Sequence, residues 1–149
     1  MHGMFYDCDT LITIDCSNLN TSNVTDMSSM FSRCDNLKTL DLSMLNTKNV
    51  KTMRSMFLNS SKLEEINLNN IDTSNVTSMY GMFYNCSSLL TLDLRNFNTK
   101  KVSDMYSMFN GCTGLKNIQV GENWILNAET DTRYMFYNCG VSEVTKITS

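Results

Sequence analysis

Apolar residues recur along this chain with a fixed period. The dipeptide Met-Phe marks the period, since it occurs at positions 4-5, 30-31, 56-57, 82-83, 108-109 and 135-136. The step from one copy to the next is 26 four times and 27 once. Aligned on this dipeptide, the copies share the pattern V-x-x-M-x-x-M-F-x-x-C-x-x-L-x-x-L-x-L. Self-similarity at a fixed period predicts an array of stacked structural repeats.

One segment of each repeat has the alternation expected of a short strand. Leu89 to Leu94 reads LLTLDL and ends in the order apolar, polar, apolar, which is typical of a strand with one buried face. Strands that recur at one period are expected to pair in parallel, about 4.8 Å apart. The equivalent segments are Leu11 to Cys16, Leu37 to Leu42, Leu63 to Leu68 and Leu115 to Val120.

The other half of each repeat predicts a short helical segment. Between Val76 and Cys86, apolar residues stand at i, i+3, i+6, i+7 and i+10, a spacing that keeps one face of an α- or 3₁₀-helix inward. An Asx-Thr step such as Asn98-Thr99 precedes the segment. This Thr column could be a rank of ligands for ice or a polymer. Capping of backbone N–H groups and bonding between coils explain it without a ligand.

Composition is consistent with one small domain and excludes much chemistry. A chain of 149 residues suits a single domain. The net charge is -3, and no run of basic residues is longer than Lys100-Lys101, which argues against binding to nucleic acid or an anionic membrane. The one His, at position 2, excludes His-dependent triads and two-imidazole metal sites. We expect no enzyme activity, no cofactor, no metal, no nucleic-acid partner and no membrane insertion by this segment.

The Met and Cys residues follow the same register. All of the 12 Met except Met44 occupy repeat positions, so Met is expected to fill the core. Five of the six Cys share one column, which Ser60 interrupts. A ladder of disulfides or soft-metal ligands would fit the spacing of adjacent coils, but Ser60 and the lack of a C-x-x-C motif favour free, buried thiols. The column consists of Cys8, Cys34, Cys86, Cys112 and Cys139, while Cys16 replaces a strand Leu.

These motifs resemble those of a known repeat family. Leu37, Leu40, Leu42 and Leu45 follow the leucine-rich repeat pattern L-x-x-L-x-L plus a further apolar position. With V-x-x-M-x-x-M-F-x-x-C added, the chain resembles the BspA-like leucine-rich repeat bacterial surface proteins, a group that includes Mycoplasma lipoprotein repeats of unknown function. The resemblance implies an α/β repeat fold, a right-handed solenoid of about five to six coils. It also implies adhesion or protein contact at a cell surface, without catalysis.

The whole chain, 1–149, is expected to form one repeat domain. Regular coils are predicted over about 4–120. In 121–149 an extra residue appears and polar residues replace the inward Val and Met, as in a C-terminal cap with a polar helical segment. The N-terminus starts inside a repeat, so we expect a piece of a longer cell-surface or secreted protein, with a small intact protein as the alternative. A monomer or an end-to-end dimer is expected.

The outward residues of the predicted strands are the first candidate site. They form a polar, mildly acidic strip with the flatness of a leucine-rich repeat binding surface. Stacked carboxylates could also hold a cation, but Asn67 and Gln119 interrupt the column. We define the strand face by the residues expected to contact a partner protein: Thr39, Asp41, Glu65, Asn67, Thr91, Asp93 and Arg95.

A second surface is predicted on the helical side of the repeats. Tyr80 and Tyr106 occupy equivalent positions in adjacent coils, Arg54 shares their column, and Tyr84 follows Tyr80 by four positions. Tyr and Arg are enriched at interface hot spots. The alternative is that these rings merely cover the Met-rich core beneath them.

Two functions fit these expectations. The leading hypothesis is a non-enzymatic recognition or adhesion module that binds a host or neighbouring-cell surface protein. The alternative is a structural spacer with no ligand of its own. The surfaces distinguish the two, because a binding surface needs varied outward residues, and the outward strand residues do vary from Thr and Asp to Glu and Asn.

Overall fold

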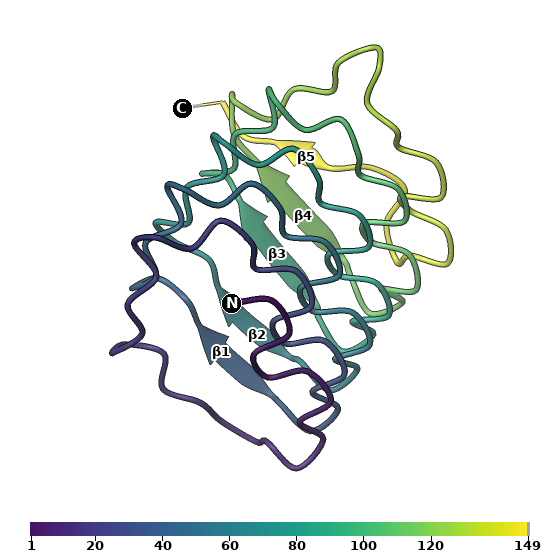
Figure 1. Cartoon of the computed structure of the whole chain (residues 1–149). Helices are drawn as coiled ribbons and strands as arrows, with labels where there is room; N and C mark the ends of the chain where they lie inside the picture. The colour runs from purple at the N-terminus through teal and green to yellow at the C-terminus, as the bar shows by residue number, and fades with distance from the viewer. Residues whose placement is uncertain (149) are drawn as a thin grey trace.

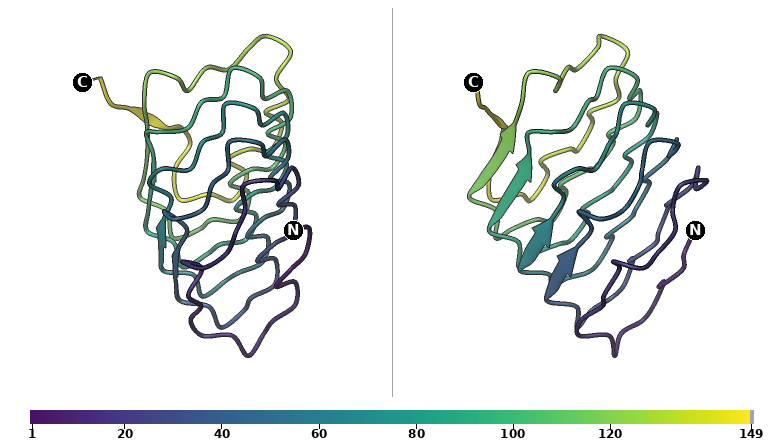
Figure 2. Two further views of the ribbon diagram at one scale, coloured as in Figure 1. Left: turned by 60° about the vertical axis from the view of Figure 1, so that its left-hand side comes forward. Right: turned by 90° about the vertical axis from the view of Figure 1, so that its left-hand side faces the viewer.

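The computed structural model describes residues 1–148 of the chain. Successive segments wind into coils that stack along one direction, with the strands together on one side of the stack (Figure 1; Figure 2). The strands are β1 (Thr39–Asp41), β2 (Glu65–Asn67), β3 (Thr91–Leu94), β4 (Asn117–Val120) and β5 (Thr145–Lys146).

The strands form two parallel sheets. β1 pairs with β2, and β3, β4 and β5 form the second sheet in that order. Leu40 lies opposite Ile66, and Leu92 lies opposite Ile118. The two members of each pair are one repeat apart, so the pairing keeps equivalent side chains on the same face. One continuous sheet was expected, but within residues 1–148 the strands β2 and β3 are not paired.

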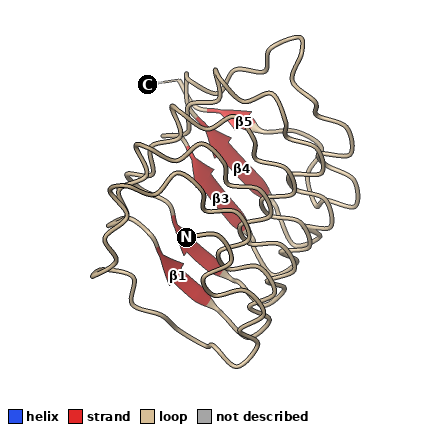
Figure 3. Cartoon of the chain, in the orientation of Figure 1, coloured by secondary structure: helices blue, strands red, loops and turns tan. Residues whose placement is uncertain are grey.

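The expected helical segments do not form, so the predicted fold class, an α/β solenoid with helical pieces, is wrong. Residues 1–148 contain strands and turns but no helix (Figure 3). Backbone bonds run sideways to the next coil: the N–H of Phe83 donates to the carbonyl of Met108 over 2.9 Å. Gly81 and Asn85 have φ values of 54° and 57°, a left-handed conformation that ends any right-handed helix.

The two ends of the chain also differ from expectation. The predicted strand at Leu11 to Cys16 does not form. This end coil has a neighbour on one side, and a long 3.4 Å bond from Lys38 N–H to the carbonyl of Ile12 joins the two. In 121–148 no helix forms, and the chain instead returns as β5, which pairs with β4.

A second column of parallel contacts continues to the last coil. Isolated bridges connect equivalent residues of successive coils along this column. The column therefore links the regular coils to the irregular segment after Val120. Its members are Asp26, Thr52, Ser78, Asp104 and Asp131.

The core is a set of columns formed by equivalent residues of successive coils, and some of these columns repeat one residue type. Along the Phe column, ring centroids are 5.2 to 6.0 Å apart and the rings are nearly parallel, as at Phe57 and Phe83. In the next column the Cys86 thiol donates to the carbonyl of Phe57 over 3.0 Å. Ser60 makes the same type of bond to Phe31 over 2.7 Å, which explains why Ser replaces Cys there.

The Thr column joins neighbouring coils. The Thr47 hydroxyl donates to the carbonyl of Asp72 over 3.0 Å and accepts from its N–H over 2.7 Å. The Asx residue before each Thr shapes the turn: Asn46 Oδ1 accepts from the N–H of Lys48 over 3.2 Å. Coil-to-coil bonding and turn formation thus account for the repeated Asx-Thr step.

Candidate functional site

The strand face is largely exposed, but Asp41 and Asn67 have structural partners within the chain. Asp41 Oδ1 accepts a hydrogen bond from the N–H of Ser43 over 2.9 Å, and Asn67 Oδ1 accepts from Asn69 over 3.0 Å. The bonds from Ser43 lower the pKa of Asp41. These side chains therefore end the strands in turns, and this role explains their column without a ligand.

Two of the charged side chains on the strand face pair with each other. Arg95 Nη2 lies 2.6 Å from Asp93 Oδ2, and hydrogen bonds from Arg95 lower the pKa of that carboxyl. A shallow depression of about 310 Å³ lies beside β1 and β2, with Thr39, Asp41, Glu65 and Asn67 among its lining residues. The structure thus brings the predicted residues of β1 and β2 together, while Asp93 and Arg95 mainly contact each other.

The predicted second surface contains a stack of aromatic and cationic groups. The rings of Tyr80 and Tyr106 are 5.4 Å apart and within 4° of parallel. The Arg54 guanidinium lies over Tyr80 at 4.5 Å from the ring centroid, close enough for a cation–π interaction. All three occupy the same position of successive coils, so the repeat period places them in contact.

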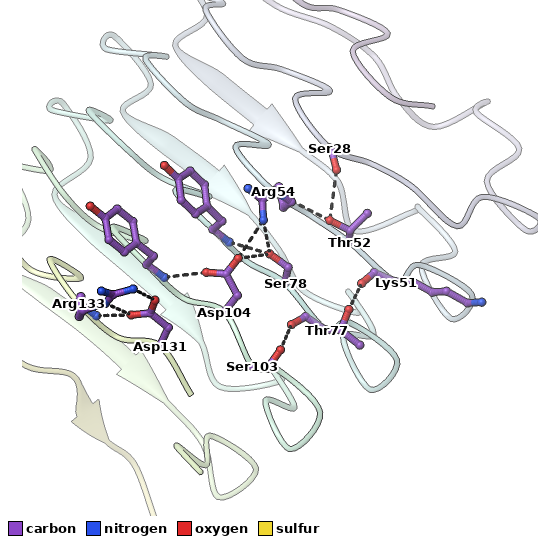
Figure 4. Close-up of polar contacts among 12 residues, drawn as sticks. Ser28, Lys51, Thr52, Arg54, Thr77, Ser78, Ser103, Asp104, Asp131 and Arg133 are labelled. Carbon is purple, nitrogen blue, oxygen red and sulfur yellow. Dashed lines mark hydrogen bonds and ion pairs between the residues drawn. The ribbon is translucent and has the colours of Figure 1, made fainter. Parts of the chain in front are cut away.

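The charges of this surface are held in pairs. Arg54 Nη1 lies 2.9 Å from Asp104 Oδ2, which also accepts a 3.0 Å bond from the Ser78 hydroxyl (Figure 4). In the coil that follows Asp104, Arg133 Nη2 lies 2.7 Å from Asp131 Oδ2. Hydrogen bonds from Arg133 lower the pKa of Asp131 to about 2. The arginines are therefore fixed beside the tyrosines with little net charge.

Two tyrosines missed by the sequence prediction extend this surface. Tyr134 packs edge-on against Tyr106 at 5.5 Å and against Tyr137 at 6.1 Å, and both new rings are 57% exposed. Together with Tyr80 and Tyr84 they border a depression of about 390 Å³. We call it the tyrosine groove; its lining residues are Leu58, Tyr80, Tyr84, Tyr106, Ser107, Asn110, Tyr134 and Tyr137.

A third depression, of about 810 Å³, is polar. Asn59 and Asn85 occupy equivalent positions of adjacent coils, and Asn85 Nδ2 donates to Asn59 Oδ1 over 3.0 Å. The sequence prediction did not single out these residues, although Asn recurs at one repeat position. We call it the polar groove; its lining residues are Arg33, Asp35, Asn59, Ser61, Asn85, Ser87, Gly111, Thr113, Asn138 and Cys139.

The cysteine column has the chemistry of core residues. All six Cys are free. Burial raises the pKa of the Cys34 thiol to about 11 and that of Cys112 to about 12, and it raises the pKa of Cys86 well above its usual value. Such thiols stay protonated and are poor nucleophiles and metal ligands. Within residues 1–148, no three His, Cys, Asp or Glu side chains come together in a way that could hold a metal ion.

Stacked coils of one repeat each, linked by parallel strands and bridges, define a repeat protein. The family model described as "Mycoplasma protein of unknown function, DUF285" matches the chain twice, over residues 1–119 and 41–147. The chain belongs to this family. Comparison with curated proteins gave no match, and comparison with solved structures gave none. In residues 1–148 there is no helix with the length and apolar character needed to cross a membrane.

Proposed function

We propose that this chain is a non-enzymatic recognition module of a BspA-like bacterial surface protein, located at the cell surface or secreted. In this proposal it binds a host or neighbouring-cell surface protein through the tyrosine groove. The observation that carries the proposal is the cluster of five tyrosines around one depression, with Arg54 and Arg133 stacked beside them.

The chemistry of the tyrosine groove suits a protein partner. Tyr and Arg bury large amphipathic surfaces and dominate the binding energy of many protein interfaces. Arg54 and Arg133 already pair with Asp104 and Asp131, so a partner need not supply carboxylates to neutralise them. The exposed rings of Tyr134 and Tyr137 gain most from being covered.

The rigidity of the tyrosine groove also favours recognition. Tyr80 is fixed between Arg54 and Tyr106, and the backbone beneath it bonds to the next coil, as in the 2.9 Å bond from Gly81 N–H to the carbonyl of Tyr106. Binding would therefore cost little conformational entropy on this side of the interface, because these side chains are already ordered. The strand face remains a second candidate contact, which the same partner could use.

The alternative function is a structural spacer. The columns of Phe and Thr, which link successive coils, would make such an array stiff whether or not it binds anything. A spacer has no use for five tyrosines gathered at one place, whereas Tyr is enriched at the contact residues of protein interfaces. This difference favours recognition over a spacer role.

Binding to cells tests the proposal. Fluorescently labelled protein is incubated with epithelial cells and with bacterial cells, before and after trypsin treatment of the cells. We expect saturable binding to at least one cell type, and its loss after trypsin, because the partner is a protein. Absence of saturable binding to either cell type would favour the spacer. Binding that survives trypsin would contradict a protein partner.

A further inference from the structure

The polar groove lies on the other side of the same turns that form the tyrosine groove. Tyr84 lines one and Asn85 the other, and Tyr137 and Asn138 are divided in the same way. Asn59, Asn85 and Asn138 have φ values of 62°, 57° and 51°, a left-handed conformation that Asn tolerates better than most residues. The same backbone conformation therefore recurs at this turn in three coils.

Gly111 interrupts this column of Asn residues. It occupies the repeat position of Asn85 and has a φ of 77°. A Cβ on Gly111 would collide with Asn85 Oδ1, so the missing side chain leaves room for the Asn85 amide to lie along the polar groove.

The groups along the polar groove offer free hydrogen-bonding capacity. Some of these groups already bond to the preceding coil: Asn85 Nδ2 donates to Asn59 Oδ1, and the Ser87 hydroxyl donates to the carbonyl of Ser61 over 3.3 Å. Others have no such bond. The Asn138 amide and the Thr113 hydroxyl line the groove and have no hydrogen-bond partner among the described residues 1–148, so water or a ligand can satisfy them. Amides and hydroxyls both donate and accept, and a ligand with many groups of the same kind would replace that water best.

We propose that the polar groove binds a neutral oligosaccharide. Sugar hydroxyls donate and accept, so they match the amide and hydroxyl groups of Asn85, Thr113 and Asn138 in either direction. The volume of about 810 Å³ lies within the range of roughly 300–1,000 Å³ typical of ligand sites. This binding does not depend on the protein partner proposed for the tyrosine groove.

Charge argues against an anionic ligand. Arg33 is the one basic side chain that lines the polar groove among the described residues, and its Nε lies 3.1 Å from Asp7 Oδ1. Asp35 lines the groove beside it, and the whole chain has a net charge of -3. Acidic glycans and nucleic acids therefore meet no excess of positive charge.

The spacing of the coils argues against a peptide. Equivalent groups recur about every 4.8 Å along the stack, whereas an extended peptide repeats its same-face groups about every 6.6 Å. The groove also lacks apolar or aromatic anchors for peptide side chains. A chain of pyranose rings carries several hydroxyls on every ring. It can therefore form hydrogen bonds to groups spaced about 4.8 Å apart without having that same spacing itself.

Titration calorimetry with three neutral hexasaccharides tests this site: cellohexaose, hexa-N-acetylchitohexaose and maltohexaose. We expect at least one to bind. Gly111→Asn tolerates the left-handed backbone but places a Cβ where Asn85 Oδ1 lies, so it should displace the Asn85 amide. Asn85→Asp should remove the amide donors at constant size. Each should weaken binding at least tenfold. Asn75→Asp is the matched control, because Asn75 also bonds between coils, to the carbonyl of Lys48, but lies outside the groove.

The melting temperature of each variant shows whether weaker binding comes from loss of the site or from loss of the fold. If Gly111→Asn destabilises the chain, Asn85→Asp still tests the site. The proposal is overturned if none of the three sugars binds with a dissociation constant below about 1 mM. It is also overturned if folded Asn85→Asp binds as tightly as the native chain. Equally tight binding of an uncharged peptide of Ser and Asn would contradict the saccharide assignment.

Discussion

At the scale of single residues, a buried position of the repeat makes the same kind of contact in successive coils. Phe83 is fully buried between Phe57 and Phe109, with centroid distances of 5.3 and 5.8 Å. Ser60 shows that a position tolerates another residue when the same bond is made. The sequence was sufficient to predict these columns, because buried positions in a stack must recur at the repeat period.

Replacing Phe83 with Ala should destabilise the fold by about 3–5 kcal/mol, because it removes a buried ring and leaves a cavity in the Phe column. Urea unfolding gives the free energy of unfolding. Leu90→Ala is the control, since Leu90 is 51% exposed and such a change should stay within about 0.5 kcal/mol. Equal losses for the two variants would show that Phe83 is not a core residue.

Cysteine alkylation should separate the buried thiols from the accessible ones. Cys86 and Cys112 are buried and have raised pKa values, so they should react with iodoacetamide much more slowly than half-buried Cys8 in the native protein. Mass spectrometry of the labelled peptides gives the rates. In denaturant, all six should react at similar rates. Rapid alkylation of native Cys86 would contradict its burial.

At the scale of elements, the sequence predicted the strands better than their connections. Strands form within four of the five predicted segments, because alternation reports one buried face. The spacing in 76–86 suited a helix equally well, since turns that bond to the next coil can bury residues at the same intervals. The deciding residues are Gly81 and Asn85, whose left-handed φ values cannot be read from the apolar pattern.

The turns after the strands should make stability depend on acid pH. Bonds from Ser43 lower the pKa of Asp41 in the folded chain below its ordinary value of 3.8. The unfolded chain therefore takes up the proton first, so the stability contributed by Asp41 is present above about pH 4 and is lost as pH falls through the lower folded pKa.

Asp41→Asn tests this dependence, because Asn67 makes the same turn without a titrating group. Between about pH 5 and pH 3 the free energy of unfolding of Asp41→Asn should fall less than that of the native chain. Urea unfolding at a series of pH values measures both curves. Parallel curves would mean that this turn does not contribute to the acid sensitivity.

At the scale of the whole molecule, the period decides which residues meet far apart in the sequence. It brought Arg54, Tyr80 and Tyr106 together as predicted. Aligned on Met-Phe, Tyr137 shares the column of Tyr84, which the sequence prediction overlooked. Tyr134 stands where the other copies have Ser or Gly, so no recurring Tyr marks its position. The grooves themselves could not be predicted, since their depth depends on how the turns project from neighbouring coils.

The central claim is that the tyrosine groove makes the protein contact. The most direct measurement is binding of the double variant Tyr80→Ala/Tyr106→Ala to the trypsin-sensitive cell surface. Tyr6→Ala, an exposed Tyr outside the groove, serves as the control, beside a chain with Glu65, Asn67, Asp93 and Arg95 all replaced on the strand face. We predict at least tenfold weaker binding, about 1.4 kcal/mol, for the tyrosine variant with its fold intact, and little change for Tyr6→Ala. Unchanged binding by the folded tyrosine variant, or loss only when the strand face is replaced, would contradict the claim.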